Sequence, residues 1–472
     1  MSASSPVAPA SAASAAPPVV IPSEGGEAAA VEGSRATPAV SLNVRNHFPL
    51  IASLDAERVS TEADGAPGFA YLDNAATTQK PACVLDALDS YYRTANANPH
   101  RSAHRLGRSA TEAFEDARAA VARFIGADAP EVVFTSGTTH ALNTVAFCFA
   151  APRLRAGDEI AVTLLEHHSN LVPWQTVAKA TGARVVYLVP DRQGCISDAE
   201  IDRVVGPKTR IVAATHVSNV LGCTAPVARI AQVAHAHGAV VVADCAQSAA
   251  HLPLDVRALG VDFAAFSGHK VYGPMGIGVL YGRRELLDGL PPLLRGGGMV
   301  DEVYEHGFTF KEGPERFEAG TQNVAGAVGL AAALRYVERV GFPAIRAHEN
   351  ALTRRLFDGL ASLRSVKLYG PGPSGGCGTA SAAGNAPADR CGIVAFNVRG
   401  LDAAETARAL DRRGVAVRAG AHCAHPLIRH LGAGAVCRAS LALYNNARDV
   451  DRFLEAVAAA PADAARALAR PL

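Results

Sequence analysis

Between about residues 69 and 282, short apolar runs alternate with stretches whose apolar residues recur at helical spacing. Two of the runs, Ala239–Ala243 and Phe263–Phe266, are continuous, which is typical of strands covered on both faces of a parallel sheet. Other strand-length runs are Glu131–Phe134, Glu159–Leu165 and Arg210–His216. This alternation predicts an α/β domain in which helices cover a mostly parallel sheet.

The pattern changes after this region, where two long helical stretches precede scattered strands. They are helices Val324–Val340 and Ala344–Leu363, then strand Ile393–Val398, helix Ala403–Arg413, strands Val415–Val417 and Arg438–Tyr444, and a helix from about Arg448. This order predicts a smaller α+β domain, and a chain of 472 residues is long enough for two domains. The predicted divisions are a disordered Ala/Pro-rich tail over 1–40, an N-terminal segment packing on the small domain over 41–68, a large domain over 69–325 and a small domain over 326–472, with a flexible insert at 371–390.

Composition narrows the class of function. The 45 Lys and Arg residues nearly balance 44 Asp and Glu, so the net charge of +1 gives no electrostatic case for binding nucleic acid or a membrane surface. The longest apolar stretches are strand-length or amphipathic, so no membrane span is expected. Nine cysteines, an odd number in a large chain, favour reduced thiols and a cytoplasmic location. No cysteine or histidine spacing indicates a metal site.

A lysine and an aspartate follow two successive apolar strands. Lys270 comes after Phe263–Phe266 in the small-residue setting Ser267-Gly268-His269, and Asp244 directly follows Ala239–Ala243. Alone, such a lysine is more often a solvated strand cap, and such an aspartate is often a helix N-cap. Together they match the needs of pyridoxal 5′-phosphate, which takes a lysine on its aldehyde and a carboxylate against its ring nitrogen. Ligands of open α/β sheets bind at the carboxyl ends of strands, where both residues are expected.

Further polar groups follow other predicted strands. Ser136-Gly137-Thr138-Thr139 lies between a strand and a helical stretch, which is the setting of a phosphate site, and Ser267 and His269 could bind the same phosphate. His167 follows another strand and could stack on the cofactor ring, although a histidine in such a place is more often a buried structural residue. Asn219 is one more polar residue after a strand.

Several ordered runs resemble the class V, aminotransferase-like family of fold-type I pyridoxal phosphate enzymes, and the chain resembles a SufS-type (group II) cysteine desulfurase from about Asn43 to Val457. The runs are Ala70–Ala76, Glu166–Gln175, Thr215–Gly222, Phe266–Lys270, Arg316–Thr321 and Cys437–Asn445. The resemblance implies a large domain with a mostly parallel seven-stranded sheet between helices, a smaller α+β C-terminal domain, and a homodimer.

Cys423 is the residue that separates a desulfurase from its relatives. It stands in Val417–Pro426, a short loop after the strand Val415–Val417. The nearby Arg418 and, when protonated, His422 would favour its reactive thiolate form. The alternative, a small buried hydrophobe, fits the loop setting less well.

The resemblance assigns roles residue by residue. It implies that Lys270 holds the cofactor and moves the substrate's α-proton, and that Cys423 attacks the substrate sulfur. The cofactor-binding residues that it implies are Asp244 at the ring nitrogen, Gln247 at the ring hydroxyl, His167 stacked on the ring, and Thr138, Thr139, Ser267 and His269 at the phosphate, joined by Thr321 from the partner subunit. Arg438 is implied to bind the carboxylate of L-cysteine with Asn219 and Arg418, by charge-assisted hydrogen bonds.

The chain departs from the SufS-type pattern at one position: Ala421 stands where these sequences usually carry the first of two histidines before the cysteine. The role of that histidine therefore has no matching residue here. A short catalytic loop also implies a dedicated sulfur-acceptor protein, SufE-like or SufU-like, that passes sulfur to an Fe–S scaffold.

Two other readings stay open. A selenocysteine lyase or another class V lyase or epimerase would use Lys270, Asp244 and Arg438 without needing Cys423. A catalytically silent scaffold for a sulfur carrier would need none of them. Alanine release by a Cys423→Ser variant and the cofactor's absorbance distinguish these readings from a desulfurase.

Overall fold

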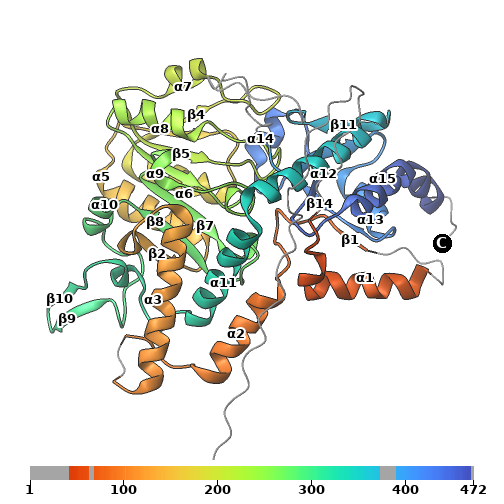
Figure 1. Cartoon of the computed structure of the whole chain (residues 1–472). Coiled ribbons are helices and arrows are strands. Elements are labelled where there is room, and N and C mark those ends of the chain that lie inside the picture. The colour runs from red at the N-terminus through yellow and green to blue at the C-terminus, as the bar shows by residue number, and fades with distance from the viewer. Residues whose placement is uncertain (1–41, 63–68, 101–102, 373–389, 469–472) are drawn as a thin grey trace, which may run out of the picture. The chain divides into compact units, whose positions relative to one another are not determined.

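The computed structural model describes residues 42–62, 69–100, 103–372 and 390–468, and these residues belong to one compact unit. The predicted tail over 1–40 and most of the predicted insert over 371–390 lie outside the described residues. The elements alternate along the first half of the chain, as the apolar pattern predicts, and form the α/β layers seen in Figure 1.

The larger sheet has seven strands in the order β2-β8-β7-β6-β5-β3-β4. Its strands are β2 (Val132–Thr135), β3 (Glu159–Thr163), β4 (Arg184–Leu188), β5 (Thr209–Thr215), β6 (Val240–Asp244), β7 (Phe263–Ser267) and β8 (Gly278–Gly282). Only β8 runs against its neighbours β2 and β7, and the other pairs are parallel. The predicted α/β class with a mostly parallel seven-stranded sheet is confirmed.

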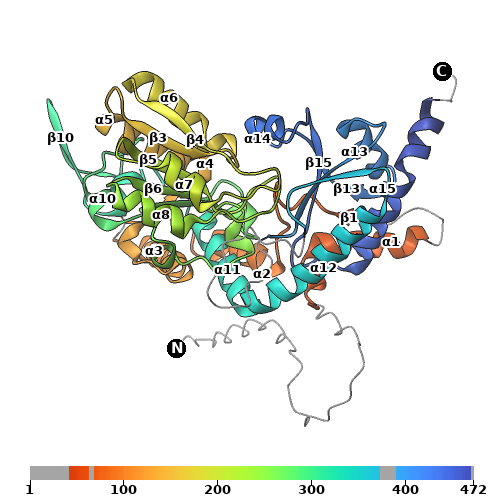
Figure 2. The same ribbon diagram turned by 90° about the horizontal axis from the view of Figure 1, so that it is seen from above.

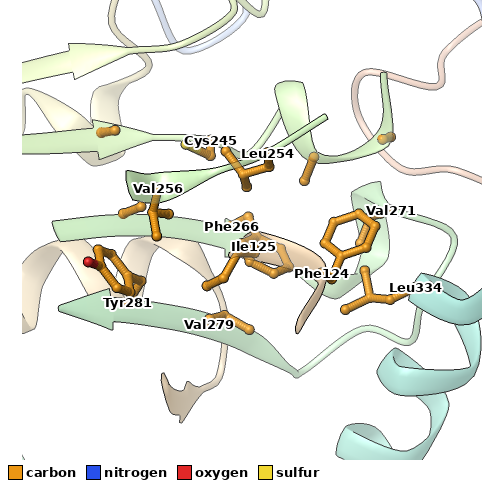
Figure 3. Packing of buried hydrophobic residues seen from close by; sticks show 14 of the residues in the cluster. Phe124, Ile125, Cys245, Leu254, Val256, Phe266, Val271, Val279, Tyr281 and Leu334 are labelled. Atoms are coloured by element: carbon orange, nitrogen blue, oxygen red, sulfur yellow. The ribbon is translucent and has the colours of Figure 1, made fainter. Parts of the chain in front are cut away.

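Helices cover both faces of this sheet because alternate strand residues point to opposite sides. On one face, Phe266 of β7 and Val279 of β8 pack with Phe124 and Ile125 of a long helix, as Figure 3 shows. On the other face, Phe263 and Ala265 pack with Trp174. The helices of the first face are α3 (Arg105–Ile125), α7 (Asp198–Val204), α8 (Val227–Ala236), α9 (Val256–Leu259) and α11 (Val324–Val340); those of the second are α4 (Thr138–Thr144), α6 (Val172–Thr181) and α10 (Arg284–Asp288).

The helix expected after residue 140 differs from the prediction. It begins earlier, as α4 at Thr138, and continues as a π-helix over Val145–Ala150 before the short α5 (Ala151–Arg153). The π-helix carries buried Val145, Ala146 and Phe149 against the sheet, so tertiary packing holds a wider turn that apolar periodicity does not reveal.

The second sheet has four strands in the order β11-β12-β15-β14, and all neighbours are antiparallel. They are β11 (Val366–Tyr369), β12 (Ile393–Val398), β14 (Arg418–Gly420) and β15 (Val436–Ser440), and the helices around them are α12 (Phe342–Ser362), α13 (Ala403–Asp411), α14 (His425–His430) and α15 (Ala447–Leu468). A separate core of residues such as Phe396 and Phe453 fills the space between this sheet and its helices. In Figure 2 these elements lie beside the larger sheet.

The sequence predicts a loop over Val417–Pro426, but its residues 418–420 form the strand β14. Arg418, Ala419 and Gly420 pair with Arg438, Cys437 and Val436 of β15. This pairing places Arg418 directly opposite Arg438, so the two arginines that were predicted to bind the substrate carboxylate become neighbours across a strand pair.

The N-terminal segment packs against both halves of the chain. It forms a 3₁₀ turn (Arg45–His47) and α1 (Pro49–Glu62), and buried Phe48 packs on Tyr272, Tyr336 and Tyr444. The short β1 (Ala70–Tyr71) pairs in parallel with β13 (Val415–Ala416). Residues 70–71 thus contact the C-terminal part, and the boundary at residue 69 stays a prediction.

The remaining elements are α2 (Ala82–Thr94), which packs on α11, and a hairpin of β9 (Val300–Tyr304) and β10 (Gly307–Phe310). Among the described residues, no helix is both long and apolar enough to cross a lipid bilayer.

Candidate active site

The carboxyl ends of the central strands meet at one edge of the seven-stranded sheet. The register pairs Thr215 with Asp244 and Asp244 with Ala265, so the last residue of β6 lies beside the middle of β7. At the other side, Ser267 and Thr135 both pair with Gly278. A Cβ on Gly278 would lie 2.5 Å from the Cα atom of Gly137, so only glycine lets β8 pass this close to the turn before α4.

A cavity of about 260 Å³ opens at this edge. It is lined by Ala75, Ala76, Thr138, Thr139, His167, Ser169, Asn219, Asp244, Ala246, Ser267, His269, Lys270, Arg418, His422, Cys423 and Arg438. Every site residue predicted from the sequence is therefore in its wall except Gln247 and Thr321. The roles predicted for these residues stay predictions.

Lys270 and Asp244 form the electrostatic centre of the cavity. Burial lowers the pKa of the Lys270 amine, while the Asp244 carboxylate opposes this shift and the charge of Arg438 adds to it. Burial likewise raises the pKa of Asp244, and the nearby Lys270 partly offsets that rise. A lysine whose amine is more easily deprotonated is a better nucleophile toward an aldehyde.

The peptide before Lys270 is held by an unusual number of donors that sequence reasoning missed. The His269 carbonyl accepts from the Thr78 amide (3.0 Å), the Thr77 and Thr78 hydroxyls (both 3.1 Å) and the Lys80 amine (3.3 Å). These residues follow β1, so the segment after it fixes the turn that presents Lys270.

Small hydroxyl residues line the side of the cavity at α4. Ser267 Oγ lies 2.7 Å from Thr138 Oγ1 and accepts from the Thr138 amide at 2.8 Å. Thr139 Oγ1 lies 2.7 Å from Oγ of Ser169, a lining residue that the sequence analysis did not single out. Four hydroxyls at a helix start are the donor set that a phosphate requires.

His167 is neutral in this setting, since burial and the charges of Lys270, His168 and Arg438 lower its pKa to about 4. Its Nδ1 accepts from the Ser169 amide at 3.1 Å. Gln247 is buried behind the wall and donates through Nε2 to the Ala75 carbonyl at 2.8 Å. Gln247 is thus one residue removed from the cavity surface.

The guanidinium of Arg438 is almost fully buried, yet its Nε has no hydrogen-bond partner. Its Nη1 donates to the Asn219 carbonyl at 2.8 Å, and Nη2 lies 3.2 Å from Asp73 Oδ1. The other Asp73 oxygen accepts from Arg418 Nε at 3.1 Å. Arg438 lines the cavity and its Nε is left without a partner inside the protein, so the positive charge of this guanidinium is only partly compensated and suits an anionic ligand.

Asp73 was given no role in the sequence analysis. In the sequence Asp73 is visible only as a charged residue inside the run Tyr71-Leu72-Asp73-Asn74. Its two arginine partners lie more than 340 positions away along the chain. The four-stranded sheet brings all three charges together.

The nucleophile loop, residues 421–424, carries Cys423 with its side chain exposed at the cavity. The expectation that a protonated His422 favours the thiolate is wrong. His422 is buried, its Nε2 donates to the Val436 carbonyl at 3.0 Å, and burial with the charges of Arg438 and Arg418 lowers its pKa to about 3. The cations that interact with Cys423 are therefore Lys270 and Arg438 rather than His422, and Arg418 lines the same cavity.

Cys423 is the only exposed thiol among the cysteines that the structure describes as free: Cys83, Cys148, Cys223, Cys245, Cys391, Cys423 and Cys437. Burial raises the pKa of Cys223, Cys245, Cys391 and Cys437 to about 12, which keeps these thiols protonated. Cys195 differs from the expected reduced state because it is disulfide-bonded.

Thr321 lies apart from this cavity. It is exposed and lines a second one with His100, Gly297 and Gly298. Its predicted contribution to a partner subunit's site stays a prediction. The described residues contain no group of three or more His, Cys, Asp or Glu side chains that could hold a metal ion.

Comparison with known proteins now defines the class. The family model "Aminotransferase class-V" matches residues 70–453. A "Probable cysteine desulfurase" of Halalkalibacterium halodurans is 46% identical over 83% of this chain and 92% of its own length. One from Synechocystis is 43% identical over 89% of this chain and 96% of its own length.

Solved structures agree. Cysteine desulfurase from Thermococcus onnurineus superposes with a TM-score of 0.79 at 38% identity, covering 90% of this chain and 98% of that one. The cysteine desulfurase CsdA of Escherichia coli gives 0.77 at 38% identity, with 91% and 99% covered. The chain belongs to the class V aminotransferase family, whose members depend on pyridoxal 5′-phosphate, and within it to the cysteine desulfurases.

The cavity fits that cofactor. Lys270 is available to its aldehyde and the buried Asp244 to its ring nitrogen, while the hydroxyls of Thr138, Thr139 and Ser267 suit its phosphate. Arg438 lines the same cavity, and its positive charge suits an additional anionic group such as a carboxylate.

Proposed function

We propose that this chain converts L-cysteine to L-alanine and leaves the sulfur on Cys423 as a persulfide. One observation carries the proposal: an exposed thiol lines the same cavity as a lysine of lowered pKa, a buried aspartate and a buried arginine with an unpaired N–H. When bound, pyridoxal 5′-phosphate supplies an aldehyde for the substrate amine and a ring that withdraws electrons from the α-carbon.

The chain's own residues bind and orient the substrate. The guanidinium of Arg438 in the cavity wall binds the carboxylate, and Arg418 lies beside it across the strand pair. Lys270 is positioned to take the α-proton, because its lowered pKa leaves more of the amine neutral. Asp244 keeps the cofactor's ring nitrogen protonated. His167, being neutral, can lie against the ring without adding a positive charge.

Cys423 completes the reaction. Its thiolate attacks the substrate sulfur, so the Cβ–S bond breaks and an S–S bond to Cys423 forms, and a proton delivered to Cβ completes L-alanine. Atoms balance, since one cysteine and one enzyme thiol give one alanine and one persulfide. The persulfide is reversible, because a second thiol can accept its outer sulfur and so restore the Cys423 thiol.

The proposal also covers the sulfur acceptor, the oligomeric state and the location of the enzyme. A short nucleophile loop cannot carry sulfur far, which supports a separate acceptor protein, SufE-like or SufU-like, and supply to Fe–S cluster assembly. Thr321 is exposed and lines cavities other than the Lys270 cavity, which supports a homodimer in which the partner's copy completes the phosphate site. A cytoplasmic location follows from the same pathway.

The test is the Cys423→Ser variant, assayed for alanine release from L-cysteine and from L-selenocysteine. We expect the cofactor's absorbance to be retained and alanine formation from L-cysteine to fall by at least ~100-fold, because the sulfur has no acceptor. The matched control is Cys83→Ser, which removes a free thiol outside the cavity. Full activity of Cys423→Ser on L-cysteine would favour a lyase that does not use this thiol.

A further inference from the structure

The nucleophile loop is held in a strained backbone shape. His422 and Cys423 both lie in the left-handed region, with φ of +50° and +53°. Two successive residues with side chains rarely adopt this conformation, and it persists only where surrounding contacts determine it. The strain falls on the proposed nucleophile and the residue before it.

Two hydrogen bonds from outside the loop hold its carbonyls. Asn219 Nδ2 donates to the His422 carbonyl at 2.8 Å. The amide of His168 donates to the Cys423 carbonyl at 2.7 Å. Both donors follow strands of the seven-stranded sheet, Asn219 after β5 and His168 in the 3₁₀ turn His168–Asn170 after β3. The shape of the loop therefore depends on the larger sheet.

A pair of histidine rings adds a second attachment on the far side of Cys423. The rings of His168 and His425 are stacked, with centroids 5.0 Å apart and an angle of 11°. His168 Nε2 lies 3.0 Å from His425 Nδ1 and 3.4 Å from the His425 amide. An amide N–H can only donate, so His168 Nε2 is the acceptor and His425 Nδ1 carries the proton.

The same turn carries His167, which lines the cavity next to Lys270. His168 thus contacts the nucleophile loop through its amide and the start of α14 through its ring, and its chain neighbour His167 lines the cavity. His425 is the first residue of α14, directly after the loop. The ring pair joins the turn that faces the cofactor to the helix that follows the nucleophile.

We propose that His425, acting through the ring of His168, is a positioning residue that holds Cys423 where its sulfur can reach the substrate sulfur. This inference rests on the proposed function, because it assigns a geometric requirement to the persulfide-forming step. His425 is not among the residues that line the Lys270 cavity. Its contribution is to keep the strained turn from relaxing.

The experiment compares His425→Ala with His425→Asn, whose side-chain Nδ2 reproduces the donor position of Nδ1. Turnover of L-cysteine is measured with excess dithiothreitol, and the rate of Cys423 alkylation by iodoacetamide is measured on the holoenzyme without substrate. The control is Arg429→Ala, which changes an exposed residue on the same short helix.

We expect His425→Ala to lower kcat by about tenfold with little change in KM, as for loss of a single positioning hydrogen bond. Alkylation should be as fast as in the unchanged protein or faster, since the thiol stays exposed. His425→Asn should restore kcat to within about twofold, and Arg429→Ala should leave it unchanged. An unchanged kcat in His425→Ala, or an equal loss in His425→Asn, would overturn the proposal.

These outcomes are separate from failure of the proposed function. If Cys423→Ser keeps its activity on L-cysteine, the persulfide step itself is absent. If only the His425 variants behave like the unchanged protein, the persulfide step stands and the ring pair has no positioning role.

Discussion

The two halves of the candidate site are built in opposite ways. The strand-end cluster, defined as Thr138, Asp244, Ser267 and Lys270, lies at or just after the ends of buried strands of the seven-stranded sheet, and regular strand pairing holds its backbone. The nucleophile loop lies beyond a three-residue strand, contains two left-handed residues and depends on side chains from elsewhere. The rigid strand-end cluster suits a cofactor that stays bound, whereas the exposed, strained nucleophile loop suits a thiol that must react with both a substrate and an acceptor.

The largest expected effect on activity comes from Lys270→Ala in the strand-end cluster. Removing the amine takes away both the cofactor's covalent partner and the group that moves the α-proton, so alanine formation should fall by at least ~10³-fold. Alanine release from L-cysteine measures this. Alkylation of Cys423 by iodoacetamide should still occur, because the hydrogen bonds that hold the nucleophile loop come from Asn219 and His168 and not from Lys270, although loss of the nearby amine charge changes its rate; a lost alkylation would show that the shape of the loop depends on Lys270.

Arg118→Ala tests the buried ion pair that supports the strand-end cluster. Arg118 and Glu318 form a fully buried two-point ion pair at 2.7 and 2.8 Å, and they also bind the Val132 carbonyl and the Phe134 amide of β2. Leaving Glu318 buried without its partner should cost about 3–5 kcal/mol of unfolding free energy. Urea denaturation measures it, with Arg123→Ala as the exposed-pair control that should change stability by less than about 1 kcal/mol.

Asp244→Asn tests the electrostatics of the strand-end cluster. An amide cannot hold the ring nitrogen protonated, and loss of a charge-assisted hydrogen bond is worth about 1.5–3 kcal/mol, or roughly 10–100-fold in turnover. Alanine release and the cofactor's absorbance band follow the change. Turnover equal to that of the unchanged protein would mean that Asp244 does not face the ring nitrogen.

The arginine pair lies where the two halves meet, and Arg438→Lys tests it. A lysine keeps the charge but loses the planar edge, so kcat/KM should fall by about tenfold or more through KM while cofactor absorbance stays the same. Steady-state kinetics with L-cysteine separates the two parameters. A loss confined to kcat would place Arg438 away from the substrate carboxylate.

The effect that is smallest at neutral pH concerns the protonation of His422 in the nucleophile loop. The pKa of His422 is lowered to about 3 by burial, so folding favours its neutral form. This contribution to stability is fully present above the unfolded value of about 6.5 and is lost as the pH falls toward 3, by up to about 1.4 kcal/mol per pH unit. His422→Gln should make the fall of the urea midpoint with pH less steep over that range, by the share of one proton, because His167, His216 and His269 also have pKa values lowered to about 4. An unaltered dependence would mean that His422 is protonated in the folded protein.

The same contrast decides how much could be predicted from the sequence. Continuous apolar runs end next to Asp244 and Lys270, so local pattern alone locates both at the same sheet edge, and the helix Val324–Val340 has the predicted bounds. Strand β14 has three residues including a glycine and carries no periodic signal. Asp73 and the ring pair of His168 and His425 depend on contacts across more than 250 positions, which no local pattern encodes.

The central claim is that sulfur moves to Cys423, and mass spectrometry after brief incubation of the holoenzyme with L-cysteine tests it most directly. The account predicts one additional sulfur atom on the peptide that contains Cys423, removed by dithiothreitol and absent in Cys423→Ser. Alanine release with no added sulfur on that peptide, or with the sulfur on another cysteine, would contradict it.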